Sequence, residues 1–238
     1  MLTANRICMS YGQRTILSNV DLQVSPGDVV GIIGVNGAGK TTLFRILCNL
    51  IPPDSGEVLF TANSASRPLS HSDIGYLPES RSLFSEVTVD RTIRFWARLR
   101  GLDSAGATHA CRLWLDRVGL LDRAPHRVSS LSKGNLQKLQ LAACMLHEPR
   151  ILILDEPFSG LDPANQIAVA NLIVQAASEG TGVVLSAHHL DLLERIATRV
   201  FILENQHLKA VQSGPSGGQL HRQFFAASAL PQCAKAGK

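Results

Sequence analysis

The chain contains no apolar run that approaches the roughly 18 residues needed to cross a bilayer. Its first residues, from Met1 to Arg6, also lack the apolar stretch of a secretory signal, so we expect no leader peptide. If the protein acts at a membrane, we therefore expect another chain to supply the membrane-spanning part.

Paired cysteines and clustered basic residues are missing as well. The five cysteines are far apart and form no C-x-x-C pair, which predicts structural thiols in a reduced, cytosolic setting and no cysteine metal site. The net charge is only +4, and the Lys and Arg residues are scattered along the chain, so no nucleic-acid partner is expected. There is no internal repeat, and 238 residues suffice for one substantial core, alone or with a smaller lobe.

Residues 34–42 read Gly-Val-Asn-Gly-Ala-Gly-Lys-Thr-Thr and match G-x-x-x-x-G-K-[ST], the phosphate-binding P-loop. An apolar stretch at 29–33 predicts a buried strand before it, and the residues after it have helical periodicity. The glycines let backbone N–H groups converge on an anion, Lys40 can reach the β- and γ-phosphates, and the Thr41 hydroxyl can bind Mg²⁺. The motif predicts a nucleoside triphosphate site formed by Asn36, Gly37, Ala38, Gly39, Lys40, Thr41 and Thr42.

Strands and helices are expected to alternate, which predicts an α/β fold. Consecutive Ile, Leu and Val residues in several strands indicate a parallel sheet covered on both faces. The expected strands are 2–9, 19–24, 29–33, 57–60, 73–77, 150–154, 182–186 and 199–203, with a loop at 61–72.

A helical pattern runs from about 88 to 147. Thr88 is a candidate cap for a helix at 89–100, and a second periodic segment covers 104–118. The aromatic residues of these segments, Phe95, Trp96 and Trp114, are interpreted as core packing rather than as cofactor contacts.

Two adjacent acids end the apolar strand in Arg150-Ile-Leu-Ile-Leu-Asp-Glu-Pro. Ligands bind at the carboxyl edge of a parallel sheet, and there Asp155 could hold Mg²⁺ directly or through water. Glu156 could orient and deprotonate an attacking water. The two carboxylates would repel each other unless a metal or another cation lies beside them.

The segment Leu131-Ser-Lys-Gly-Asn, which we call the signature segment, is close to L-S-G-G-Q and precedes a helical stretch. With the P-loop, the Leu-Asp-Glu-Pro box and Ser159-Gly-Leu-Asp, it makes the chain resemble the ATP-binding-cassette (ABC) ATPases over nearly its whole length. The resemblance implies a P-loop NTPase core with a mostly parallel sheet, an N-terminal antiparallel β subdomain and an inserted helical subdomain at about 85–140. It implies an ATPase domain over 1–215 and a short tail at 216–238.

The resemblance also implies roles for single residues. Ser132, Lys133 and Gly134 would reach across a dimer to the γ-phosphate bound by the other subunit, and Asp162 would couple the two sites. Tyr11 would stack on adenine, although a core tyrosine is an open alternative. His188, rather than its neighbour His189, would contact the γ-phosphate.

Departures from the family pattern are also informative. Glu79 stands where many members have Gln, and it could still meet Mg²⁺ through water. Lys133 replaces a Gly and Asn135 replaces a Gln in the signature segment. We expect Lys133 either to offset the extra acid by facing the partner's γ-phosphate or to be an exposed residue without a role. Together, Glu79 and the altered signature resemble the branch that partners exporter permeases of the ABC-2 class.

The expected function is that of an ATPase subunit, with ATP and Mg²⁺ as cofactors and Glu156, His188 and Lys40 as catalytic residues. Its expected partners are a separate membrane permease and a second ATPase subunit, identical or different, at the cytoplasmic face of the inner (cell) membrane. Two alternatives are a soluble ABC ATPase of translation or DNA repair and a regulator that binds ATP without hydrolysing it.

Overall fold

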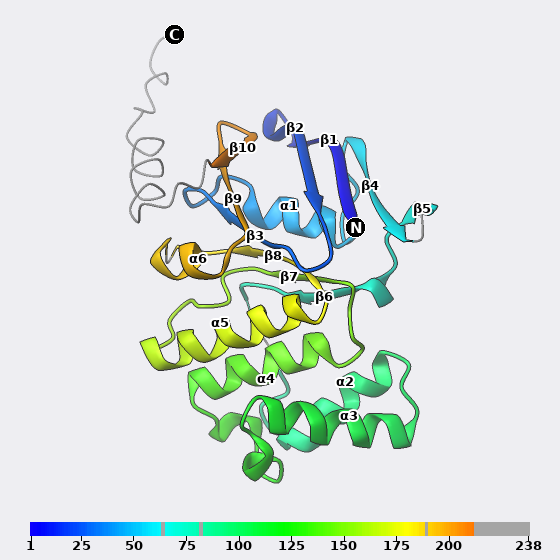
Figure 1. Ribbon diagram of the computed structural model, residues 1–238, viewed down its shortest axis with the longest axis vertical. Helices are drawn as coiled ribbons and strands as arrows, with labels where there is room; N and C mark the ends of the chain where they lie inside the picture. The colour runs from blue at the N-terminus through cyan, green and yellow to red at the C-terminus, as the bar shows by residue number, and fades with distance from the viewer. Residues whose placement is uncertain (63–64, 81–82, 189, 212–238) are drawn as a thin grey trace.

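The computed structural model describes residues 1–62, 65–80, 83–188 and 190–211. These residues form a small antiparallel sheet, a large mostly parallel sheet and a set of helices that cover the large sheet (Figure 1). The proposed tail at 216–238 lies outside the described residues, and the boundary at 215 stays a prediction.

The large sheet has six strands in the order β10-β9-β3-β8-β7-β6. Its neighbouring strands are parallel except β10, which forms an antiparallel hairpin with β9. Side chains alternate between two cores: Val30 and Ile32 face one, whereas Val29 and Ile33 face the other. The predicted sheet with two covered faces is therefore confirmed. Its strands are β3 (Val29–Ile33), β6 (Ile74–Leu77), β7 (Ile151–Leu154), β8 (Gly182–Ser186), β9 (Arg199–Glu204) and β10 (His207–Val211).

The antiparallel sheet has the order β2-β1-β4-β5. Gly12, with a φ of 60°, lies in the turn between the first two strands, a conformation that glycine adopts without strain. This sheet confirms the expected N-terminal antiparallel subdomain. Its strands are β1 (Leu2–Tyr11), β2 (Arg14–Val24), β4 (Ser55–Ala62) and β5 (Ala65–Pro68).

The loop expected at 61–72 was wrong. Strand β4 runs to Ala62, β5 follows at Ala65–Pro68, and a 3₁₀ turn, η1, covers His71–Asp73. All four side chains of β5 are exposed at the edge of the sheet, so no apolar alternation marks the strand in the sequence. Side-chain contacts hold the segment in place: Arg67 forms an ion pair with Asp73 at 2.7 Å and lies over the ring of Phe60.

Helix α1 (Lys40–Leu47) lies between the two sheets, whereas α4 and α5 cover the opposite face of the large sheet (Figure 1). Leu43 and Phe44 of α1 are fully buried in the core that both sheets share. The helices are thus positioned by burial on the two faces of one sheet. The remaining helices of the core are α4 (Lys133–Met145), α5 (Pro163–Ser178) and α6 (Leu190–Ile196).

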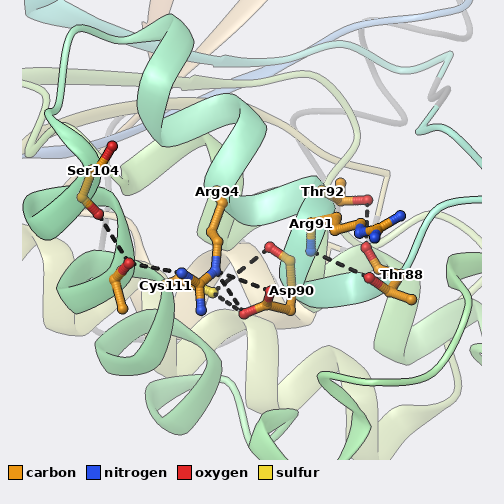
Figure 2. Close-up of polar contacts among 8 residues, drawn as sticks. Thr88, Asp90, Arg91, Thr92, Arg94, Ser104 and Cys111 are labelled. Atoms are coloured by element: carbon orange, nitrogen blue, oxygen red, sulfur yellow. Dashed lines mark hydrogen bonds and ion pairs between the residues drawn. The ribbon is translucent and has the colours of Figure 1, made fainter.

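The helical lobe contains α2 (Val89–Leu99) and α3 (Ser104–Arg117), followed by the 3₁₀ turns η2 (Leu121–Arg123) and η3 (Val128–Ser130). The predicted cap is confirmed, because the Thr88 hydroxyl accepts from the N–H of Arg91. Figure 2 shows how Arg94 ties the two helices together. It pairs with Asp90 on its own helix at 2.9 Å and donates to the Thr108 hydroxyl of α3 at 2.7 Å.

The core assignment of the lobe's aromatic residues holds only in part. Trp114 is buried and Trp96 packs partly against the core. Phe95, however, is 47% exposed and contacts Phe84 and Trp96 edge-on, with ring centroids 5.7 and 5.8 Å away. Consecutive residues of a helix point about 100° apart, and on α2 Phe95 lies toward the surface while Trp96 packs partly against the core.

The described cysteines differ in environment. Cys48, Cys111 and Cys144 are buried, and burial raises the pKa of the Cys111 thiol to about 12. Cys8 lies on β1 near the surface, where hydrogen bonds lower its pKa. All four described cysteines are free thiols.

None of the helices in the described residues combines the length and the apolar character that a bilayer span requires.

The lobe's packing can be tested within α2. Ile93 is fully buried and Leu99 is 62% exposed on the same helix. We expect Ile93→Ala to lower the free energy of unfolding by about 2–5 kcal/mol, because it leaves a cavity. The control Leu99→Ala should change it by no more than about 0.5 kcal/mol. Urea denaturation measures both, and equal effects would contradict the assigned burial.

Candidate functional site

The P-loop connects the end of β3 to the start of α1. Gly37 and Gly39 have φ angles of 79° and 107°, which residues with a Cβ rarely adopt. A Cβ on Gly39 would also lie 2.8 Å from Cγ2 of Ile16 on β2. Glycine therefore lets the loop pass close to β2 and turn into the helix, so that the first N–H groups of α1 face the site.

Lys40 folds back over this loop. Its ammonium donates to the Gly34 carbonyl at 2.7 Å, and the side chain is buried. Burial lowers the pKa of Lys40, and the three nearby carboxylates oppose this shift. These carboxylates belong to Glu156, Asp155 and Glu79.

Asp155 follows β7 and is almost completely buried. Its carboxylate accepts from the Thr41 hydroxyl at 2.7 Å and from the Ser186 hydroxyl at 2.8 Å. The Ser186 hydroxyl in turn accepts from the N–H of Glu156 at 2.8 Å. The sequence analysis missed Ser186, whose only signal was its place at the end of a strand just before His188.

Glu156 has a φ of 51°, an uncommon backbone conformation for a non-glycine residue. This left-handed turn separates its carboxylate from that of Asp155. One Glu156 oxygen lies 3.2 Å from Nε2 of His188, and the contact of His188 with a γ-phosphate stays a prediction. Its neighbour His189 lies outside the described residues. Burial raises the pKa of Glu156, against the opposing effects of His188 and Lys40.

A cavity of about 330 Å³ brings these groups together. Glu79, which follows β6, lines it, and its contact with Mg²⁺ stays a prediction. Arg14 and Ile16 of β2 line it too, and the sequence analysis did not identify them. The lining residues are Arg14, Ile16, Asn36, Gly37, Gly39, Lys40, Thr41, Thr42, Glu79, Asp155, Glu156 and His188.

Two predicted nucleotide contacts do not line this cavity. Tyr11 ends β1 opposite Arg14 and is 51% exposed, so the alternative of a core tyrosine was wrong. The N–H of Ala38 donates to the Val35 carbonyl at 3.1 Å, and its side chain packs against the core. For both residues a nucleotide contact stays a prediction.

The signature segment does not contribute to the cavity of its own chain either. Ser132 caps α4 by accepting from the N–H of Asn135, and Lys133 and Gly134 form the first turn. Asp162 caps α5 in the same way, by accepting from the N–H of Asn165. The proposed contact of Ser132, Lys133 and Gly134 with a partner's nucleotide therefore stays a prediction.

The predicted metal ligands supply only oxygen atoms, which suits Mg²⁺. Thr41 and Asp155 already lie within hydrogen-bond distance of each other, and Glu79 lines the same cavity. In the described part of the chain, no group of three or more His, Cys, Asp or Glu side chains could hold a metal ion.

Comparison with known proteins identifies the family. Residues 17–159, which include the P-loop, the signature segment and both acids, match the family model described as ABC transporter. The chain belongs to the ABC transporter family. It is 34% identical over 204 residues to the uncharacterized ABC transporter ATP-binding protein YhaQ of Bacillus subtilis, an alignment that covers 86% of this chain and 68% of YhaQ. It is 28% identical over 213 residues to the linearmycin resistance ATP-binding protein LnrL of the same organism, covering 89% and 68%.

The fold places the chain in the same family. A solved structure of the ATP-binding subunit of an ABC transporter superimposes with a TM-score of 0.78 and 28% identity, covering 96% of this chain and 95% of that subunit. This confirms the expected ABC ATPase fold, with its P-loop core and antiparallel subdomain.

The raised pKa of Glu156 predicts how the thermal stability of the chain depends on pH. The pKa of Glu156 is higher in the folded chain than in the unfolded chain. Its ionisation therefore destabilises the fold as the pH rises above the pKa of the unfolded chain. Glu156→Gln should therefore raise Tm near neutral pH by about 2–4 °C, as expected for about 1 kcal/mol in a chain of this size. The gain should shrink near pH 4, where the carboxyl is protonated. Calorimetry without nucleotide measures it.

Glu57→Gln provides the control, because Glu57 is exposed on β4. Its Tm should match that of the wild type at both pH values. A lower Tm for Glu156→Gln near neutral pH would contradict the assigned cost of its charge.

Proposed function

We propose that this chain binds and hydrolyses ATP as a subunit of an ABC transporter and drives export through a separate membrane permease. The observation that carries the proposal is the position of Glu156. Its carboxylate lies at the carboxyl edge of the parallel sheet, beside His188 and within the field of Lys40, in the cavity that the P-loop lines.

Each of these residues would have a distinct task in phosphoryl transfer. Lys40 and the first N–H groups of α1 would hold the phosphates. Thr41 and Asp155, with Glu79, would hold Mg²⁺, which supplies positive charge to the phosphate oxygens. Glu156, whose pKa is raised by burial, would orient the attacking water and accept a proton from it, and His188 would contact the γ-phosphate.

The signature segment supports a dimer. It lies outside the cavity of its own chain, yet it places the N-terminus of α4 and the Ser132 hydroxyl at an exposed turn. A second ATPase subunit, identical or different, could complete each site with this turn. Hydrolysis would then require closure of the two subunits around ATP.

The helical lobe offers a docking region for the permease. A cavity of about 140 Å³ lies between the segment after β6 and helices α2 and α4, and Trp96 and Leu83 line it. Phe84 and Phe95 are exposed on the same lobe. A permease bound there would hold the chain peripherally at the cytoplasmic face of the cell membrane.

Export rests on the resemblance of Glu79 and the altered signature segment to the branch that serves ABC-2 permeases. LnrL, a relative over most of this chain, is named for resistance to linearmycin. Removal of a compound from the cell is one way to give resistance. A membrane protein encoded by a gene adjacent to that of this chain would be the partner to test.

The proposed reaction is tested by ATPase kinetics with the permease present. Glu156→Gln should lower kcat at least about 100-fold, because it removes the proton acceptor, while ATP binding persists. Glu57→Gln is the matched control and should keep the wild-type rate. Equal inactivity of the wild type and Glu156→Gln would favour a regulator that only binds ATP. Wild-type activity without any association with membranes would favour a soluble ABC ATPase.

His188 should also set the pH dependence of this rate. The positive charge of His188 lowers the pKa of Glu156, so its loss leaves that pKa higher. Because Glu156 must be ionised to accept a proton, His188→Asn should move the acid limb of the kcat/KM profile to higher pH. His109→Asn, on the exposed face of α3, is the control. An acid limb that stays in place or moves to lower pH would contradict the coupling.

A further inference from the structure

The start of α4 packs against the loop before α5 and against the first turn of α5. Two side chains and two glycines form this contact. The Lys133 side chain contacts Gly160. A Cβ added to Gly160 would collide with the ammonium of Lys133 and would lie 2.9 Å from the Cε of Lys133. The Asn165 side chain contacts Gly134 in the same way. A Cβ added to Gly134 would collide with the side-chain amide of Asn165 and would lie 2.6 Å from the Oδ1 of Asn165. We call the contact between these four residues the junction.

Neighbouring hydrogen bonds hold the junction in register. Asn165 donates through Nδ2 to the Asp162 carboxylate at 2.6 Å, and its backbone N–H donates to the same carboxylate at 3.0 Å. One turn further along α4, the buried Gln137 donates to the Pro157 carbonyl at 2.7 Å. Residues 133, 134 and 137 share one helix face, so this face of α4 follows the backbone from 157 to 165.

That backbone begins directly after Glu156. The N–H of Ser159 donates to the Glu156 carbonyl at 3.2 Å, and the turn then leads to Gly160. A side chain that fixes the loop at 160 therefore also restrains the exit of the chain from Glu156, whose left-handed backbone needs support from its surroundings.

We propose that Lys133 is a positioning residue, which holds residues 157–162 against the signature segment of the same chain so that the two move as one unit. The proposal rests on the proposed function, since only in an ATPase does the placement of Glu156 affect turnover. The ammonium and Cε of Lys133, at the end of its exposed side chain, make this contact with a glycine of the same chain. The proposed role is therefore packing inside one chain, unlike a cation that faces the partner's phosphate.

Hydrogen exchange of the full chain without nucleotide tests the junction independently of catalysis. Lys133→Ala should raise amide exchange in residues 157–165 about threefold or more, because the loop loses its cover. Lys133→Met keeps the stem without the charge and should preserve most of the protection. Unchanged exchange in Lys133→Ala would overturn the proposal, whatever the ATPase activity.

Kinetics then separate packing from charge. Lys133→Ala should lower kcat about threefold to tenfold with KM for ATP unchanged, and Lys133→Met should stay within about twofold of the wild type. If Lys133→Met were as slow as Lys133→Ala and also had a higher KM, the ammonium would act on phosphate and the proposal would be wrong. A wild type without ATPase activity would instead refute the proposed function and leave the exchange result standing.

Two glycines supply a matched pair. Gly160 and Gly119 both have a φ of 66°, but no atom lies within 4 Å of a Cβ at Gly119. Gly160→Ala should therefore lower kcat clearly more than Gly119→Ala, which carries the same backbone cost. In the Lys133→Ala background the collision is gone, so adding Gly160→Ala should have a smaller effect than it has alone. Fully additive effects would contradict contact between the two residues.

Discussion

The site depends on the burial of two adjacent carboxylates at the end of one strand. Asp155 and Glu156 are both less than a tenth exposed, and like charges so close would normally force one of them to take up a proton. The backbone resolves the conflict by turning at Glu156, which sends the two side chains to different partners. The Ser186 hydroxyl fixes both residues at once, because it donates to the Asp155 carboxylate and accepts from the Glu156 N–H.

The charge balance of the cavity follows from the same arrangement. Three carboxylates line the cavity, those of Glu79, Asp155 and Glu156, and the basic groups of Arg14, Lys40 and His188 leave it with no excess of positive charge. A triphosphate would add further negative charge. The cavity is therefore electrostatically incomplete without a divalent cation, and this gives the proposed Mg²⁺ a physical reason beyond the family resemblance.

The motifs could be predicted from sequence because each is local. A glycine loop between a buried strand and a helix, or an acid at the end of an apolar strand, is complete within ten residues. Ser186, Arg14 and Ile16 escaped because their role comes from strand pairing, which brings distant segments to one edge. The edge strand β5 was not predicted for a different reason: its exposed side chains face no core, so they show no apolar alternation in the sequence.

The sequence also misjudged residues whose direction depends on tertiary packing. Phe95 and Trp96 looked alike as apolar residues of one helix, yet only the packing of α2 decides which of them faces inward. Tyr11 was open between stacking on adenine and packing in the core, and its place at the end of β1 leaves it 51% exposed. The predicted domain boundary at 215 and His189, the alternative to His188, lie outside the described residues.

The uneven environments of the cysteines have a practical consequence. Cys8 lies near the surface with a lowered pKa, whereas the thiols of Cys48 and Cys111 are buried with raised pKa values. Thiol reagents attack a partly exposed thiol of lowered pKa far faster than a buried thiol. Among the described cysteines, a dye or spin label would thus attach to β1 alone, and it would report from the antiparallel sheet while the nucleotide cavity stays unmodified.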